Sequence, residues 1–133
     1  MRILLIEGDE ILAEIMAEHL GAVGHSVSAV HDGAEALRAV DESDPDLLIL
    51  DYQIPGISGL AILLAVRQDP FGDTMPVMML TANAGKLLSA RAHHDGADGY
   101  LAKPVSPHQL LGRVEALLKS AALARRVSRA AAR

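Results

Sequence analysis

The sequence contains no cysteine and no tryptophan, and its only aromatic residues are Tyr52, Phe71 and Tyr100. The absence of cysteine excludes disulfide bonds and thiolate metal sites. The core must therefore be aliphatic, and a chain of 133 residues that is 50% hydrophobic can build one sizeable core. No apolar stretch approaches the roughly 20 residues of a membrane span, and no signal-peptide pattern precedes the first apolar run. We expect one cytoplasmic domain with no membrane partner.

Charge is distributed unevenly along the chain. Residues 1–118 hold 7 basic and 17 acidic side chains, a net charge of −10, whereas residues 119–133 hold five basic side chains and no acid. Direct binding to nucleic acid depends mainly on neutralising phosphates. The acidic body therefore argues against a nucleic-acid partner. The basic tail is expected to form a solvated helix face, with docking on an acidic partner or a nucleic-acid backbone as the weaker alternative.

Short apolar runs alternate with helical patterns throughout the chain. The apolar runs predict strands at Arg2–Ile6, His25–Ala29, Leu47–Leu50, Val77–Leu80 and Gly99–Ala102. Residues with helical spacing predict helices over 10–20, 33–42, 59–68 and 85–94, and a fifth that opens with a capping box at Ser106. This (βα)5 order with short connections predicts an α/β fold, a parallel sheet with helices on both faces.

The helix boundaries also have sequence signals. Asp9 is a plausible N-cap of the first helix and Gly21 a plausible stop. Ser58 is expected to cap the helix over 59–68, and Pro107 occupies the favoured first position of the last helix. These boundaries predict that each strand is followed by only a short loop.

Polar side chains follow four of the predicted strands at the point where each strand ends. Glu7 and Asp9 follow the first strand, Asp51 the third, Thr81 the fourth and Lys103 the fifth. In a doubly wound sheet, ligands bind beyond the carboxyl ends of the strands. Carboxylate oxygens suit a hard cation such as Mg²⁺. A lysine and a hydroxyl beside them suit a phosphoryl group.

Four stretches, in order, resemble the receiver domain of response regulators in two-component signalling: "ILLIEGDE", "PDLLILDYQIPGISGL", "MPVMMLTAN" and "GADGYLAKP". The resemblance runs from about residue 2 to residue 119. It implies a flavodoxin-like fold with strand order 2-1-3-4-5 and a cis peptide bond between Lys103 and Pro104. It also implies a receiver domain over residues 1–120, which leaves 121–133 as an Ala/Arg-rich extension of the last helix or a frayed tail.

The resemblance also implies roles for individual residues. Asp51 resembles the phosphoacceptor, and Lys103 resembles the lysine that neutralises phosphoryl oxygens. Thr81 resembles the hydroxyl that follows the phosphoryl group, and Tyr100 the aromatic switch that turns inward afterwards. The backbone carbonyl of Gln53 resembles a metal ligand. Such a module accepts a phosphoryl group and signals; it is not expected to be an enzyme.

Gly8 is the main departure from the family pattern. The family has two adjacent acids after the first strand; here Glu7 takes the first place and Gly8 the second. The expected Mg²⁺ ligands are Glu7, Asp51 and the Gln53 carbonyl, with Asp9 as a further candidate if the glycine lets it turn inward. Because one carboxylate is missing, Mg²⁺ is expected to bind weakly.

The expected function is that of a phosphorelay receiver that takes its phosphoryl group from a histidine kinase or phosphotransfer protein. Its downstream protein partner would bind the face formed by the fourth helix, the fifth strand and the fifth helix. The alternative is a pseudo-receiver, an interaction module in which Gly8 has weakened or removed Mg²⁺-dependent phosphorylation. A flavodoxin-like electron carrier is disfavoured because few aromatic residues are present to sandwich a flavin.

Overall fold

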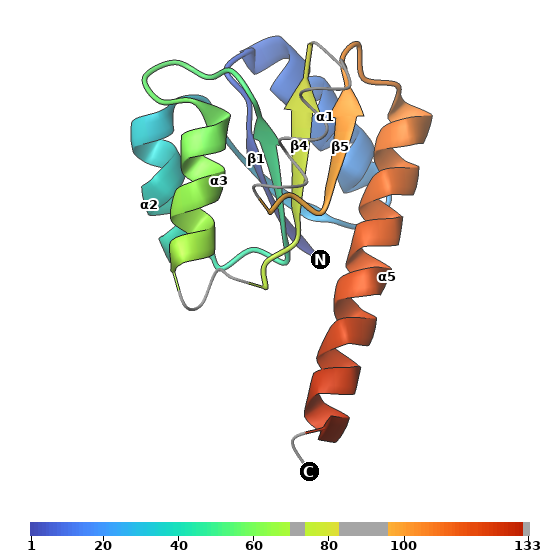
Figure 1. Ribbon diagram of the computed structural model, residues 1–133. Coiled ribbons are helices and arrows are strands. Elements are labelled where there is room, and N and C mark those ends of the chain that lie inside the picture. The colour runs from blue at the N-terminus through green and yellow to red at the C-terminus, as the bar shows by residue number, and fades with distance from the viewer. Residues whose placement is uncertain (70–73, 83–95, 132–133) are drawn as a thin grey trace.

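The computed structural model describes residues 1–69, 74–82 and 96–131, without the side chain of Ser128. The described chain forms a parallel sheet with helices on both faces (Figure 1). Its elements are β1 (Arg2–Ile6), α1 (Glu10–Ala22), β2 (Ser26–Val30), α2 (Gly33–Ser43), β3 (Leu47–Asp51), α3 (Gly59–Gln68), β4 (Val77–Thr81), β5 (Gly99–Ala102) and α5 (Pro107–Ala131). The strand order is β2-β1-β3-β4-β5, which confirms the predicted fold class.

Most predicted boundaries agree with the structure to within a residue or two. Asp9 caps α1 and Ser58 caps α3 through side-chain oxygens, as expected. The predicted stop at Gly21 is wrong because α1 continues to Ala22, and the left-handed residue that turns the chain is Gly24, with φ of 98°. The predicted helix over 85–94 lies outside the described residues. The Lys103–Pro104 peptide bond is cis, as predicted.

The second strand lies one residue later than predicted, at Ser26–Val30 in place of His25–Ala29. Its register is set by pairing with β1, in which Arg2 lies opposite Ser26 and Ile6 opposite Val30. Val27 packs against one core cluster and Val30 against the other, so the two residues lie on opposite faces of the sheet. The pairing with β1 therefore decides the strand boundary, and local hydrophobicity alone does not.

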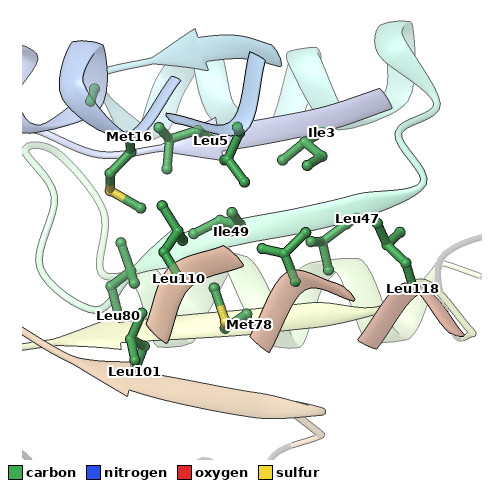
Figure 2. Packing of buried hydrophobic residues seen from close by; sticks show 13 residues of the cluster. Ile3, Leu5, Met16, Leu47, Ile49, Met78, Leu80, Leu101, Leu110 and Leu118 are labelled. Atoms are coloured by element: carbon green, nitrogen blue, oxygen red, sulfur yellow. The ribbon is translucent and has the colours of Figure 1, made fainter. Parts of the chain in front are cut away.

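Two aliphatic clusters fill the spaces on either side of the sheet. One packs β-strand residues such as Leu5, Ile49 and Leu80 against buried residues of α1 and α5 (Figure 2). The other packs the alternate strand residues, such as Ile6 and Leu50, against α2 and α3. The central strands β3 and β4 are buried at every position, because helices cover both of their faces.

At the amino edge of the sheet, Arg67 ties three segments together. This residue of α3 donates to the Gly96 carbonyl (2.8 Å), the Met75 carbonyl (2.6 Å) and Asp98 Oδ2 (2.8 Å). Asp98 Oδ2 also accepts from the backbone N–H of Val77, at 2.8 Å. The approaches to β4 and β5 are therefore fixed to the end of α3.

Helix α5 is longer than the sheet that it covers. Its buried residues Leu110, Val114 and Leu118 pack on the body, and the Ala/Arg-rich segment continues the same helix to Ala131, away from the sheet (Figure 1). None of the described helices is both long enough and apolar enough to cross a bilayer.

Candidate functional site

The carboxyl ends of β1, β3 and β4 and the segment after β5 bring the predicted site residues to one edge of the sheet. Asp51 is the last residue of β3 and Thr81 the last of β4, and both are buried. Glu7 directly follows β1, and Lys103 directly follows β5. The backbone N–H of Lys103 donates to the Thr81 carbonyl at 2.7 Å, which anchors the lysine beside β4.

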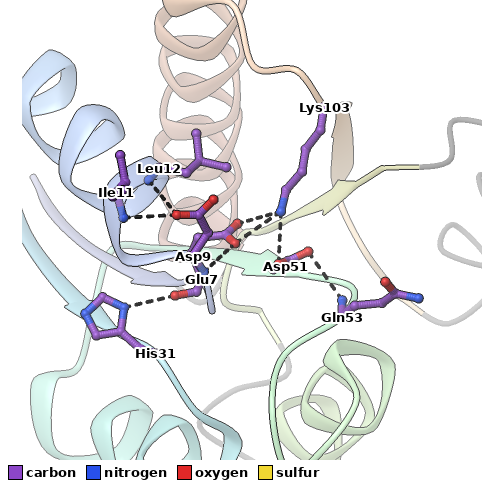
Figure 3. A network of polar contacts seen from close by, with 8 residues as sticks. All are labelled: Glu7, Asp9, Ile11, Leu12, His31, Asp51, Gln53 and Lys103. Atoms are coloured by element: carbon purple, nitrogen blue, oxygen red, sulfur yellow. Dashed lines mark hydrogen bonds and ion pairs between the residues drawn. The ribbon is translucent and has the colours of Figure 1, made fainter.

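The centre of the site is a lysine shared by two carboxylates (Figure 3). Lys103 Nζ donates to Asp51 Oδ2 at 3.0 Å and to Glu7 Oε1 at 3.1 Å, and it lies 3.0 Å from Glu7 Oε2. The Glu7 side chain is 1% exposed and that of Asp51 7%. Two buried acids with one base leave a surplus negative charge in a pocket with little water.

The same arrangement changes the proton affinities of two groups. Burial raises the pKa of Glu7 above its ordinary 4.5, and the neighbouring Asp51 carboxylate raises it further; the hydrogen bonds from the Asp9 N–H and Lys103 offset part of this. Burial lowers the pKa of Lys103, but its hydrogen bonds to Glu7 and Asp51 and the attraction of both carboxylates outweigh burial, so the Lys103 pKa is raised overall. Lys103 is therefore a cation at neutral pH.

Glu7 is held in place by its backbone and by its side chain. Its N–H donates to the Val30 carbonyl at 3.0 Å. Its carbonyl accepts a hydrogen bond at 3.0 Å from Nδ1 of His31, which must be the protonated nitrogen because a carbonyl only accepts. Glu7 Oε1 accepts from the Asp9 N–H at 3.1 Å, whereas the buried Oε2 accepts no hydrogen bond. Glu7 Oε2 instead makes an ionic contact with Lys103 Nζ at 3.0 Å, beside Asp51.

Asp9 lies next to the pocket but serves the helix. Its Oδ1 accepts from the N–H groups of Ile11 (3.0 Å) and Leu12 (3.1 Å), which are the unsatisfied donors of the first turn of α1. The structure does not bring Asp9 together with Glu7, Asp51 and Lys103 as a side-chain ligand.

Gly8 lies against Pro55 of the β3–α3 loop. A β-carbon on Gly8 would lie 2.9 Å from Pro55 Cδ and 3.8 Å from the His31 carbonyl oxygen. Gly8 is not among the glycines with positive φ, so its importance is close approach and not an unusual backbone conformation. Neither this contact nor the His31 bond was predicted from the sequence; the proline four residues after Asp51 was the available signal.

The remaining donors suit a hard cation only in part. Glu7 and Asp51 supply carboxylate oxygens, and Asp51 Oδ1 accepts only a long hydrogen bond (3.3 Å) from the Gln53 N–H. The unbonded Glu7 Oε2 beside them favours a cation ligand. Across the described ranges, no three acidic or histidine side chains are grouped as they would be to hold a metal.

Tyr100 lies on β5 and is partly buried against the cluster that faces α2 and α3. Its backbone carbonyl accepts from Arg113 of α5 at 3.2 Å. Tyr100 therefore connects the edge strand to α5 and to the core, on a strand that ends beside Lys103.

Comparisons with known proteins agree with this geometry. Residues 3–115 match the family model described as the response regulator receiver domain. The chain is 38% identical over 120 residues to the phosphate regulon transcriptional regulatory protein PhoB of Rhizobium meliloti, covering 90% of this chain and 53% of that protein. It is 36% identical over 118 residues to the DNA-binding response regulator MtrA of Mycobacterium tuberculosis, covering 89% of this chain and 50% of MtrA.

The chain thus spans about half the length of these two relatives. Among solved structures, the chemotaxis protein CheY4 of Vibrio cholerae superposes with a TM-score of 0.83 at 26% identity, covering 87% of this chain and 97% of CheY4. The match to CheY4 covers nearly a whole chain, whereas the matches to PhoB and MtrA cover about half of each.

Proposed function

Because the chain belongs to the response regulator receiver family, we propose that it accepts a phosphoryl group on Asp51 from a histidine kinase or phosphotransfer protein. The observation that carries this proposal is the Lys103 ammonium, which contacts Asp51 Oδ2 at 3.0 Å beside the buried Glu7. It places a fixed positive charge where phosphoryl oxygens would lie if Asp51 were the nucleophile. The receiver acts as a signalling module whose state depends on that modification.

The chemistry needs little from the protein beyond position and charge. An Asp51 oxygen forms the new bond to phosphorus while the bond from phosphorus to the donor's imidazole nitrogen breaks, and the imidazole takes up a proton. The phosphoryl group adds roughly −1.5 to −2 of charge. Lys103 offsets part of this charge, and the Thr81 hydroxyl at the end of β4 would be a second donor to a phosphoryl oxygen.

A weakly bound Mg²⁺ would complete the charge balance of this site. Glu7, Asp51 and the Gln53 carbonyl would hold it, and it would neutralise charge on the transferring group. Asp9 is assigned to the helix cap in this proposal. Because Gly8 supplies no carboxylate, the affinity should be lower than that of a site with three acids.

Signal output would follow from a shift of Thr81 and Tyr100. If Thr81 is drawn toward the phosphoryl group, the space next to it opens and the partly buried Tyr100 ring can turn inward. Such a change would alter the surface of β5 and α5 and so its affinity for a downstream protein. The fourth helix of the expected partner face falls in residues 83–95, outside the described part of the chain.

We infer that this receiver does not itself contact nucleic acid. Its relatives PhoB and MtrA are named for transcriptional regulation and DNA binding, but the matched half here carries the acidic body of −10 over residues 1–118. A cytoplasmic location fits a partner of the kinase type.

Incubation with acetyl phosphate, with and without Mg²⁺, followed by intact-mass measurement tests the proposal. The wild type should gain one adduct of about 80 Da, the mass expected for a phosphoryl group on the nucleophile. The Asp51→Asn variant should gain none, and the matched control Asp41→Asn, on the exposed end of α2, should behave as wild type. An Asp51→Asn protein that is modified equally would overturn the assignment. A wild type that stays unmodified would favour the pseudo-receiver alternative.

A further inference from the structure

A groove of about 640 Å³ lies between α2 and α3, on the sheet face opposite α1 and α5. Apolar side chains and acids share its lining, among them Leu37, Val40, Met75, Asp41, Asp44 and Asp69. Leu37 is 37% exposed. The groove therefore offers an apolar surface with carboxylates along it.

The backbone at this groove is also electronegative. Helices α2 and α3 end at Ser43 and Gln68, next to the groove-lining Asp44 and Asp69, so both negative helix ends lie there. Helix α2 has no basic residue in its last turn, and the Arg67 guanidinium at the end of α3 is bonded to Gly96, Met75 and Asp98. An incoming cation would meet carboxylates such as that of the exposed Asp41, although Asp44 also lies 3.8 Å from Arg2, and an apolar side chain would meet Leu37 and Val40.

The distal part of α5 has the complementary chemistry. It carries Arg125, Arg126 and Arg129 without an acid, and it exposes Leu123 (63%) and Val127 (61%) four residues apart on one face. Residues 121–131 span about 16 Å as a helix, enough to lie along a groove between two helices. We call residues 121–131 the α5 extension.

We propose that the groove between α2 and α3 binds the α5 extension of a second copy of this chain. Within one copy, the start of the extension lies near the amino-edge end of the groove, where Ala121, Ala124 and Arg125 line a neighbouring hollow with Asp44 and Met75. Leu123 and Val127 stay exposed there, because α5 packs with α1 on the other side of the sheet and its distal part runs away from the body (Figure 1). Docking joins unlike surfaces of two copies, with Leu123 and Val127 on the apolar lining and the arginines toward the acids. Two copies can exchange extensions, or further copies can add in sequence.

Sedimentation velocity of the full chain, from low to high micromolar concentration at two salt concentrations, tests this docking. The wild type should self-associate, and added salt should weaken the association because charge pairing contributes to it. Two variants each disrupt one side of the contact. The extension variant carries both Arg126→Glu and Arg129→Glu, and the groove variant carries Asp41→Lys. Each should weaken self-association by about tenfold or more.

Mixing the two variants provides the sharpest test. The groove variant keeps a native extension and the extension variant keeps a native groove, so an equimolar mixture should recover association that neither shows alone. Glu14→Lys, the same charge change on exposed α1, is the matched control and should associate as wild type. The proposal is overturned by a wild type that is monomeric at every concentration. It is equally overturned by variants that associate as wild type, or by a mixture that fails to recover association.

Discussion

Two long cationic side chains occupy opposite edges of the sheet, and they differ in the number of carboxylates that they contact. Arg67, at the amino edge, meets two backbone carbonyls and one carboxylate. Lys103, at the carboxyl edge, meets two carboxylates, one of which keeps a buried oxygen without a hydrogen bond. Both side chains are largely buried, at 16% and 22% exposure.

The difference is one of charge balance. Among the described residues, the Arg67 guanidinium is paired with the Asp98 carboxylate, and Asp98 uses its shared oxygen to fix the backbone of Val77 as well. Around Lys103 one positive charge meets two negative charges, and burial, together with the neighbouring Asp51 carboxylate, raises the pKa of Glu7. The Arg67 contacts hold backbone segments together and stabilise the fold; a network with surplus charge remains ready to bind a cation or a group that brings one.

The largest stability effect is expected from removing the balanced cation. Arg67→Met should lower the free energy of unfolding by about 2 kcal/mol, a value reduced from that of a fully buried pair because Asp98 is partly exposed. The loss leaves Asp98 and two carbonyls without their donor. Urea denaturation measures the change, and Arg38→Met on the exposed face of α2 is the control. If Arg67→Met were as stable as Arg38→Met, the structural role assigned to Arg67 would be wrong.

Local sequence patterns were sufficient to predict the α/β class, and the family resemblance supplied the strand order. The residues Leu47–Leu50 of β3 form an unbroken apolar run, and caps such as Asp9 and Ser58 are local signals that the structure confirms. Two predicted boundaries were wrong for different reasons. Pairing with β1 places β2 one residue later, and α1 continues through Gly21 because a helix tolerates glycine at modest cost.

Contacts between distant loops of the site were not predictable in the same way. The convergence of Glu7, Asp51 and Lys103 follows from parallel strands that end at one edge, and the structure places them in contact. The approach of Pro55 to Gly8 and the Arg67–Asp98 pair join residues 47 and 31 positions apart. Nothing local in the sequence encodes such distances, because they depend on how the loops pack.

A second test adds a negative charge to the site around Lys103. Gly8→Asp should tighten Mg²⁺ binding by about tenfold, or 1.4 kcal/mol, because a third carboxylate joins the site. The new β-carbon must displace Pro55, so Gly8→Asp combined with Pro55→Ala should bind at least as tightly as Gly8→Asp. Isothermal titration with Mg²⁺ measures both, and Gly8→Ala controls for the contact alone.

Equal Mg²⁺ affinity of the wild type and Gly8→Asp would mean that Asp9 or Glu7 already compensates for the missing acid. Tighter binding by Gly8→Ala would show that the position of Pro55, and not the carboxylate count, limits the site. Either outcome would separate charge from packing as the cause of weak binding.

Neutralising one acid at each edge of the sheet should change the free energy of unfolding in opposite directions. Glu7→Gln should raise the free energy of unfolding at pH 7 by about 1 kcal/mol, since it removes the surplus charge and leaves Lys103 paired with Asp51. Asp98→Asn should lower it, because it leaves Arg67 without a carboxylate. Thermal melts show whether each variant is more or less stable than the wild type. If both variants were stabilised, or both destabilised, the charge-balance argument would be refuted.

The smallest expected effect is a pH dependence that belongs to Glu7. Because the folded-state pKa of Glu7 is raised above 4.5, its stabilising contribution is complete below 4.5 and is lost as pH rises through the raised value. The difference in stability between Glu7→Gln and the wild type should therefore grow from pH 4 toward neutrality. A difference that is constant over this range, measured by denaturation at several pH values, would contradict the assigned shift.

The Asp9 cap has a consequence for observing the site. The N–H groups of Ile11 and Leu12 are protected from exchange with solvent deuterium by the same carboxylate oxygen that is the spare candidate ligand. If added Mg²⁺ recruited Asp9, these two amides would lose their acceptor and exchange faster while the rest of α1 kept its rate. The first turn of this helix thus records, residue by residue, which carboxylate an arriving ion uses.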